Sequence, residues 1–196
     1  MRRAFDIAVS ATLLVVLSPL LAAAAAAIRL ETHGPVLYRQ RRVGLRGRPF
    51  EMLKLRTMVH GAEHLGAGLK VNAGDERITR TGALLRRTSL DELPNLVNVL
   101  RGEMAIVGPR PTLQAQVDTY DERQRRRLDV KPGITGWAQV NGRASLPWQE
   151  RIELDLWYIE HRSAALDARI LWRTAAVVFG GGGLYKGSSG GWQGEL

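Results

Sequence analysis

The densest cluster of chemically capable residues lies in residues 86–111, which read RRTSLDELPNLVNVLRGEMAIVGPRP. Asp91 and Glu92 are adjacent carboxylates at the expected start of a helix. The positive end of a helix dipole favours both ionised carboxylates and phosphate groups. A Mg²⁺ ion binds carboxylate and phosphate oxygens, so it would fit between this pair and a phosphorylated ligand. The simpler alternative is that both acids only cap the helix.

Basic residues close to this pair favour the chemical alternative. Arg86 and Arg87 precede it, and Arg110 stands between two prolines whose fixed φ angles restrict where its side chain points. Lys54 and Arg56 lie further upstream, at the end of a predicted strand. Each cation alone is typical of a solvated surface. Several stiffly held cations near carboxylates indicate a diphosphate site if the fold brings them together.

Local patterns predict the elements that must position these residues. Residues 36–43 and 50–55 predict two strands joined by a glycine-containing turn. Residues 90–104 predict a short helix that begins at the acidic pair, with Ser89 and Glu92 in the spacing of a capping box. Further helices are expected over residues 112–128, 148–161 and 166–179, whereas residues 60–82 and 131–143 have the composition of surface loops. The expected fold class is α+β, mainly helical, with a small β-hairpin or sheet.

Residues 7–28 contain no charged side chain and are about as long as a helix that spans a membrane. Ser18 and Pro19 lie near the middle, where proline should break the helix and serine could satisfy part of the freed backbone. Three interpretations stay open, namely a cleaved signal peptide, a kinked spanning helix and a re-entrant hairpin. Arginine flanks both ends, at Arg2 and Arg29, which suits a segment that enters and leaves on the cytoplasmic side.

The net charge of +9 comes almost entirely from arginine, which indicates nucleic acid, an anionic membrane surface or phosphorylated substrates as partners. The basic run at residues 123–127 (RQRRR) lacks the interleaved aromatic residues of nucleic-acid binders, so membrane headgroups explain it better. The absence of cysteine excludes disulfides and thiolate metal sites. His60 and His64 are four residues apart but do not form the zinc-protease motif.

The sequence resembles the bacterial sugar transferase family, the monotopic phosphoglycosyl transferases that act on polyprenol phosphate. The resemblance rests on FDIAVS, the pair Ser18–Pro19, GPVLYRQRRVG, FEMLKLRTM, TRTGALLRRTSLDELPNLVNVLRGEMAIVGPRP, KPGITGWAQVNGR and DLWYIEH, in the family's order. It implies a re-entrant membrane hairpin over residues 1–33 and a cytoplasmic catalytic domain over residues 34–185, resting on the bacterial inner membrane through amphipathic helices. Residues 186–196 are expected to form a flexible tail.

The resemblance also implies roles for individual residues. Asp91 matches the family nucleophile, which attacks the β-phosphate of a UDP-sugar, releases UMP and passes the phosphosugar to polyprenol phosphate. Glu92 matches the second member of the catalytic dyad. The family requires Mg²⁺, and Asp91 is implicated in binding it. The cations expected around the phosphates are Lys54, Arg56, Arg86, Arg110 and Arg143. Membrane lipids are further expected partners, nucleic acid is not, and a homo-oligomer is left open.

Two non-enzymatic interpretations stay open on the residues alone. A membrane-bound adaptor would use residues 123–127 to hold anionic lipids or partners, and Asp91 would then be dispensable. A secreted basic protein would lose its N-terminal segment. No residue can be assigned to reading one sugar, so glucose, galactose and N-acetylated sugars all remain open as substrates.

Overall fold

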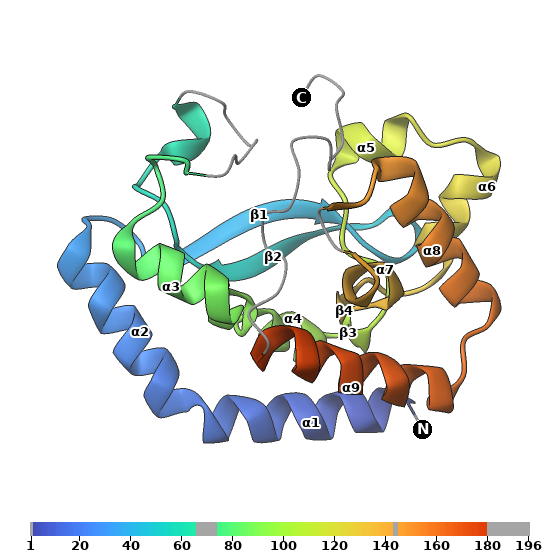
Figure 1. The fold of residues 1–196 in the computed structure, drawn as a ribbon, viewed down its shortest axis with the longest axis horizontal. Helices are drawn as coiled ribbons and strands as arrows, with labels where there is room; N and C mark the ends of the chain where they lie inside the picture. The colour runs from blue at the N-terminus through green and yellow to red at the C-terminus, as the bar shows by residue number, and fades with distance from the viewer. Residues whose placement is uncertain (1, 66–73, 143–144, 180–196) are drawn as a thin grey trace.

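Helices make up most of the computed structural model, which describes residues 2–65, 74–142 and 145–179 (Figure 1). The helices are α1 (Arg2–Val16), α2 (Ser18–Glu31), α3 (Arg80–Thr88), α4 (Asn95–Arg101), α5 (Gln114–Asp118), α6 (Glu122–Arg125), α7 (Trp137–Val140), α8 (Trp148–Glu160) and α9 (Ala164–Phe179). The strands are β1 (Leu37–Val43), β2 (Pro49–Leu55), β3 (Ala105–Val107) and β4 (Gly133–Thr135). Short 3₁₀ turns are η1 (Leu45–Gly47), η2 (Ala62–His64), η3 (Leu90–Glu92) and η4 (Arg126–Asp129). The architecture is therefore mainly helical with two small sheets, which confirms the predicted α+β class.

Helices α1 and α2 meet at Leu17 with a bend of 60°, which gives the open L-shape along the lower and left edges of Figure 1. Pro19 has no N–H to donate to the Val15 carbonyl, and the Ser18 hydroxyl donates to that oxygen instead at 2.7 Å. The break lies where the sequence predicts it. Within the described ranges, no single helix is long and apolar enough to cross a membrane, whereas the bent pair passes that test as a unit.

The bent pair is tied to the rest of the fold at both of its ends. Near its start, the Arg3 guanidinium donates to the Leu100 carbonyl at the end of α4 at 2.8 Å. Near its end, the Glu31 carboxylate accepts the N–H groups of Arg80 and Thr81 at 2.7 and 2.9 Å. These bonds satisfy a helix C-terminus and a helix N-terminus that would otherwise lack partners. Both ends of the pair therefore contact the same body of the protein.

Strands β1 and β2 pair antiparallel from Leu37 opposite Leu55 to Val43 opposite Pro49, which confirms the predicted strand pair. Alternate β2 side chains, among them Phe50 and Met52, enter the main core with α4, β3, α8 and α9. On the opposite side of β2, Glu51 is exposed, whereas Leu55 is buried in a second core cluster with residues of α2 and α3. The hairpin thereby presents its last residues beside the segment that carries the acidic pair.

The second sheet was not predicted. Strands β3 and β4 pair in parallel, with Ala105 opposite Gly133 and Val107 opposite Thr135. The backbones approach so closely that a Cβ atom on Gly133 would lie 2.1 Å from the Gly108 nitrogen. Three-residue strands carry too little local pattern to be recognised, and this pair depends on glycine at a long-range contact.

Two predicted helices are divided in the observed structure. Residues 90–104 form η3, α4 and a turn into β3, and residues 112–128 contain α5, α6 and η4. Ser89 does not form the predicted cap, because it adopts a left-handed φ of 57° that ends α3. Helix α3 itself was not predicted, and its first residues overlap the loop expected over residues 60–82. Helices α8 and α9 are confirmed within two residues, and the predicted tail at 186–196 lies outside the described residues.

Candidate active site

A pocket of about 600 Å³ lies among α1, η3, the Arg110 loop, α7, α8 and α9. Asp91 and Glu92 both line it. They lie on η3, which the left-handed Ser89 turns away from the axis of α3. A non-glycine residue in that conformation costs about 1 kcal/mol. Such local strain is typical of functional sites, and here it directs the acidic pair into the pocket.

Asp91 carries a carboxylate that is free to react. It is 9% exposed, and within the described ranges its side chain makes no hydrogen bond or ion pair. Burial and then the adjacent Glu92 raise the pKa of Asp91 to about 6. The neighbouring cations act in the opposite direction, namely Lys54, Arg86 and Arg110. At neutral pH the group is therefore an ionised and poorly solvated carboxylate, which are the properties of a nucleophile.

Glu92 is held in a different environment. Its Oε1 atom accepts from Lys54 Nζ at 2.8 Å and from Arg110 Nη2 at 2.7 Å. Although burial acts in the opposite direction, Arg110 and then Lys54 lower the pKa of Glu92 below its ordinary value. Two neighbouring carboxylates with pKa values moved apart are a pattern of active sites. Glu92 is thus a permanently charged anchor for two cations.

The remaining predicted cations have different positions. Arg86 lines the pocket, and its Nε donates to the Thr57 hydroxyl at 2.7 Å. Arg56 does not line the pocket, because its guanidinium donates to the carbonyls of His33 and Thr32 at 2.7 and 2.9 Å. It therefore holds the segment that follows α2. Arg143 lies outside the described residues.

Three further arginines line the pocket, and none of them was predicted to lie at the acidic pair: Arg42, Arg127 and Arg151. Burial and then Arg110 lower the pKa of Arg42 to about 10, and the same two causes lower that of Arg151. The Arg110 guanidinium therefore repels those of both Arg42 and Arg151. The excess of positive charge suits a ligand with two or more phosphate charges. The only sequence signal of Arg42 and Arg151 is that they are arginines, which the chain has in abundance, whereas Arg127 belongs to the basic run at residues 123–127.

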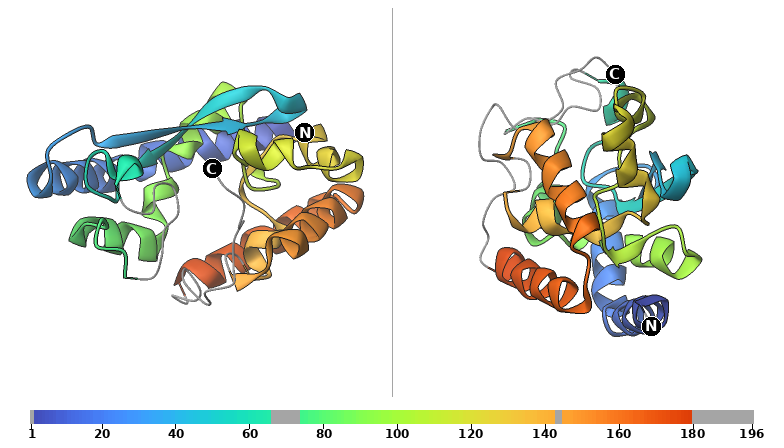
Figure 2. Two further views of the ribbon diagram at one scale, coloured as in Figure 1. Left: turned by 90° about the horizontal axis from the view of Figure 1, so that it is seen from above. Right: turned by 90° about the vertical axis from the view of Figure 1, so that its right-hand side faces the viewer.

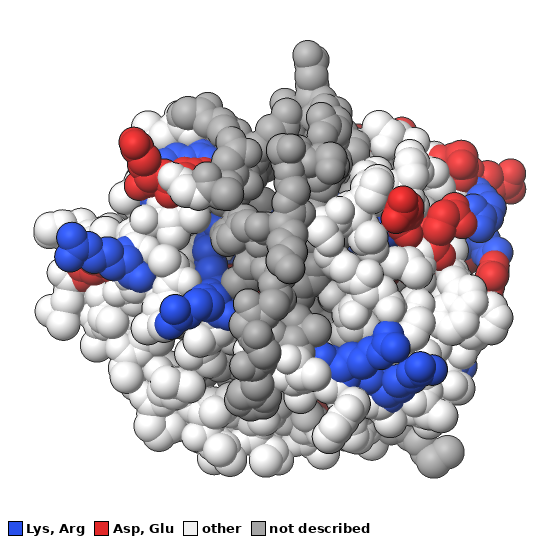
Figure 3. Space-filling view, viewed as in Figure 1, with Lys and Arg blue, Asp and Glu red and all other residues white. Residues whose placement is uncertain are grey.

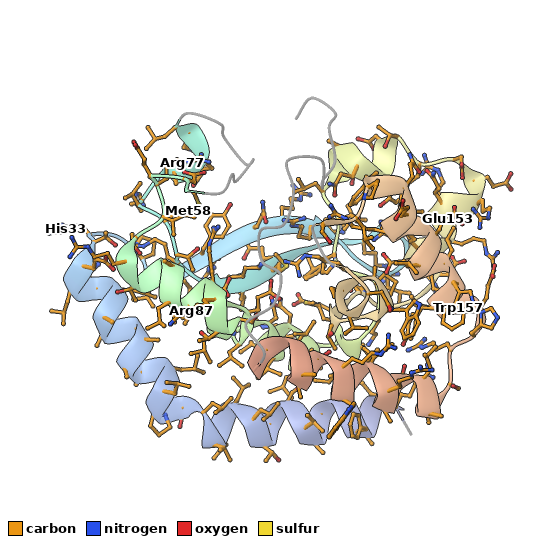
Figure 4. The ribbon with its side chains drawn as sticks, in the orientation of Figure 1. His33, Met58, Arg77, Arg87, Glu153 and Trp157 are labelled. Atoms are coloured by element: carbon orange, nitrogen blue, oxygen red, sulfur yellow. The ribbon has the colours of Figure 1, made fainter. Side chains whose placement is uncertain are left out.

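The basic run at residues 123–127 is largely neutralised by α8. Arg123 pairs with Glu153, labelled in Figure 4, and Arg126 pairs with Glu160 at 2.9 Å. Arg127 is buried and pairs with Asp155 at 2.6 Å. Acidic and basic side chains accordingly interleave at the right-hand edge of Figure 3. The prediction that this run is a free basic surface for headgroups or partners is wrong, because the acids of α8 lie opposite it.

Part of the pocket wall is apolar. It includes Leu13 of α1, Ile134 of β4 and both Leu171 and Val178 of α9. Helices α1 and α9 both lie along the lower side in Figure 1 and in the right-hand view of Figure 2. Large apolar residues are exposed on these helices, among them Trp172 at 79%. The pocket is therefore amphiphilic, because arginines and apolar side chains line it together with Asp91.

The described part of the site offers few protein ligands to a metal ion. In the described part of the chain, no group of three or more histidine, cysteine, aspartate or glutamate side chains could hold a metal ion. Both oxygens of Glu92 face Arg110, which leaves Asp91 as the free carboxylate. Mg²⁺ often takes only one or two protein carboxylates and completes its shell with substrate phosphates and water. The donor set at Asp91 fits that mode of binding.

Comparison with known proteins gives the same answer as the motifs. The sequence model of the family described as bacterial sugar transferase matches residues 1–181. The chain is 43% identical over 178 residues to the uncharacterized sugar transferase EpsL of Bacillus subtilis, covering 91% of this chain and 87% of that protein. It is 45% identical over 181 residues to the UDP-glucose:undecaprenyl-phosphate glucose-1-phosphate transferase of Caulobacter vibrioides, covering 88% and 67% respectively.

A third relative acts, by its name, on a different sugar. The UDP-N-acetylgalactosamine-undecaprenyl-phosphate N-acetylgalactosaminephosphotransferase of Aeromonas hydrophila is 39% identical over 188 residues, which cover 93% of this chain and 44% of that protein. The match therefore extends across proteins named for different donors. On the strength of the family match and these identities, the chain belongs to the bacterial sugar transferase family.

Proposed function

We propose that this protein transfers a sugar 1-phosphate from a UDP-sugar to undecaprenyl phosphate or a similar polyprenol phosphate and releases UMP, as the first membrane step in assembling a glycan. The observation that carries the proposal is the amphiphilic pocket, whose wall combines the unpaired Asp91 with arginines and apolar side chains. A nucleotide diphosphate suits the arginines and an isoprenoid chain suits the apolar side chains. The names of two relatives include both substrates.

The proposed reaction has two displacements. A carboxylate oxygen of Asp91 attacks the β-phosphorus of the donor, and the bond from that phosphorus to the bridging oxygen breaks. UMP leaves with the bridging oxygen, and the phosphosugar remains on Asp91 as an acyl phosphate. A phosphate oxygen of the lipid then attacks the same phosphorus and releases the carboxylate. A covalent intermediate divides one difficult transfer into two easier ones.

The charged residues around Asp91 have separate roles in this proposal. Arg86 and Arg110 neutralise the diphosphate and the departing UMP. Glu92 holds Lys54 and Arg110 in place through bonds of 2.8 and 2.7 Å, so it acts by positioning cations. Mg²⁺ would be held by Asp91 together with donor phosphates, and it would offset negative charge on the diphosphate.

The decisive experiment uses the donor without the lipid. Detergent-solubilised protein is mixed with UDP-glucose or UDP-N-acetylgalactosamine and Mg²⁺, and UMP is measured while the protein is analysed by intact and peptide mass spectrometry. We expect a burst of about one UMP per protein and a phosphosugar adduct on the peptide that contains Asp91. EDTA should suppress the burst. Release of UMP only when lipid is added, with no adduct on residue 91, would contradict the two-step mechanism.

We also propose that α1 and α2 form a re-entrant segment that enters only the cytoplasmic leaflet of the inner membrane. Both ends of the pair are bonded to the same body, at Leu100 for α1 and at Arg80 for α2. A segment whose two ends meet one domain has both ends on one side of the bilayer. The exposed apolar residues between them would face lipid, among them Val15 and Val16, at 73% and 65% exposure.

Cysteine labelling tests this topology, because the natural sequence has no cysteine. Ala4→Cys and Leu30→Cys place thiols at exposed positions near the two ends of the pair. A membrane-impermeant maleimide should label both in inside-out vesicles and neither in intact spheroplasts. Labelling of one position from each side would instead establish a segment that crosses the bilayer.

A further inference from the structure

The wall of the pocket contains polar atoms that lack hydrogen-bond partners. On α7, both side-chain atoms of Gln139, Oε1 and Nε2, are buried without a partner in the structure. On α8, the Oδ1 atom of Asp155 is in the same condition. Both residues line the pocket that holds Asp91. Because buried polar atoms are nearly always hydrogen-bonded, each of these atoms calls for a partner from a ligand or from water.

The Oδ1 atom of Asp155, which has no hydrogen-bond partner, is held in a fixed position. The other oxygen of the carboxylate, Oδ2, accepts from Arg127 Nε at 3.0 Å and from Arg127 Nη2 at 2.6 Å. The Asp155 residue as a whole is 1% exposed, so its side chain has little freedom to turn. Oδ1 is therefore an acceptor in a fixed position, because the Arg127 guanidinium orients the carboxylate and the surrounding protein buries it.

The three atoms without partners indicate, by their donor or acceptor character, which kind of ligand group would bind them. Asp155 Oδ1 and Gln139 Oε1 are acceptors, and Gln139 Nε2 is a donor. A phosphate is disfavoured by the carboxylate, and a uracil ring offers a single N–H donor. Neighbouring hydroxyl groups on a sugar ring offer several donors that also accept. The set of two acceptors and one donor matches such hydroxyl groups.

We infer that Gln139 and Asp155 bind hydroxyl groups of the glycosyl donor and so help to determine which donor is used. The inference rests on the proposed function and adds specificity-determining residues to it. The hydroxyl groups belong either to the transferred sugar or to the ribose of the nucleotide. Because the protein atoms are closed off from bulk water, a donor that lacks the matching hydroxyl leaves them unpaired, which is costly.

The test compares wild type with Gln139→Leu in the full-length protein. UMP release is measured for UDP-glucose, UDP-N-acetylgalactosamine and the monodeoxy analogues of UDP-glucose, and inhibition is measured for UMP and 2′-deoxy-UMP. We expect kcat/KM of wild type to fall about 10- to 100-fold for at least one deoxy-sugar. In Gln139→Leu, kcat/KM for the parent donor should fall by a similar factor. The contrast, which is the ratio of kcat/KM for the parent donor to kcat/KM for its deoxy analogue, should shrink to near unity.

The arms of the experiment distinguish the two sources of hydroxyl groups. If the two residues bind a sugar hydroxyl, Gln139→Leu should lose the contrast between parent and deoxy-sugar donors, while inhibition by UMP should stay unchanged. A ribose hydroxyl predicts that the lost contrast is between UMP and 2′-deoxy-UMP. If Gln139→Leu keeps every contrast of wild type, the inference is overturned and the atoms are bonded to water only. If wild type releases no UMP from any UDP-sugar, the proposed function fails as well.

The melting temperature of the variants shows whether Gln139 binds the donor or only stabilises the fold. Replacing an unpaired buried amide by leucine should leave the melting temperature unchanged or raise it. Gln114→Leu is the matched control, because that exposed residue on α5 bonds only to Asp118 in the same helix. It should change none of the contrasts. Asp155→Asn, which can still accept from Arg127, serves as a second variant and should flatten the same contrast. A contrast that survives in Asp155→Asn also counts against the inference.

Discussion

Replacing Asp91 by asparagine should abolish UMP release and at the same time stabilise the protein at neutral pH. The amide cannot form the acyl phosphate, so we expect the donor half-reaction to fall by roughly 10⁴-fold or more. The effect should be on kcat, because the arginines that hold the diphosphate remain in place. Stopped-flow or quenched-flow measurement of the UMP burst, with the donor saturating, checks this.

The stability gain follows from the raised pKa of Asp91. Its pKa is about 6 in the folded protein against an ordinary value of 3.8. The folded state therefore favours the protonated form, so the contribution of Asp91 to stability is fully present below pH 4 and is lost as the pH rises through about 6. The asparagine side chain of the variant has no charge to bury. At pH 8 the variant should be more stable by about 2–3 kcal/mol, and the difference should vanish near pH 4.

The same pKa sets the pH dependence of wild-type activity. Attack requires ionised Asp91, so kcat/KM of the donor half-reaction, which reports the free enzyme, should rise with pH and reach half of its maximum near pH 6. Asp129→Asn is a suitable control, because Asp129 is exposed at the end of η4 and lies outside the pocket. It should leave burst size, pH profile and stability unchanged. A normal burst in Asp91→Asn would remove the basis of the proposed mechanism.

The parts of the fold that could be predicted are those with a local cause. The break at Ser18 and Pro19 follows from a missing N–H, and the β1–β2 pair follows from two short apolar-rich runs around glycines. Helices α8 and α9 have enough length for their periodicity to be recognised. Strands β3 and β4 do not, since their pairing depends on the close approach of Gly108 and Gly133 across the fold.

The site shows the same division between local and long-range causes. Asp91, Glu92 and Arg110 stand out because of an unusual local sequence, and the structure brings them together with Lys54 and Arg86. The pocket positions of Arg42 and Arg151 depend on the packing of the hairpin and α8. Arg56, two residues beyond Lys54, points toward α2 instead. Side chains from one short segment can thus either line the site or stabilise the fold around it, and this difference depends on tertiary structure.

Arg127→Met should cause the largest loss of stability among single changes in the basic run. Arg127 is 5% exposed and donates to Asp155 and to the Tyr120 hydroxyl, while its guanidinium lies 5.5 Å from the centre of the Trp148 ring. Methionine would leave Asp155 buried and unpaired. Removing one partner of a buried ion pair typically costs about 3–5 kcal/mol. Urea unfolding at pH 7 measures the loss.

Arg123→Met provides the matched comparison within the same run. Arg123 pairs with Glu153 of α8 just as closely, but the two side chains are 56% and 52% exposed. Solvent screens such a pair, so we expect a loss of less than about 1 kcal/mol. The double variant Arg127→Met with Asp155→Leu should regain much of the stability lost in Arg127→Met, because no buried charge then lacks a partner. If Arg127→Met and Arg123→Met lose equal stability, or if the double variant regains none, burial of the Asp155 charge is not what makes Arg127 necessary.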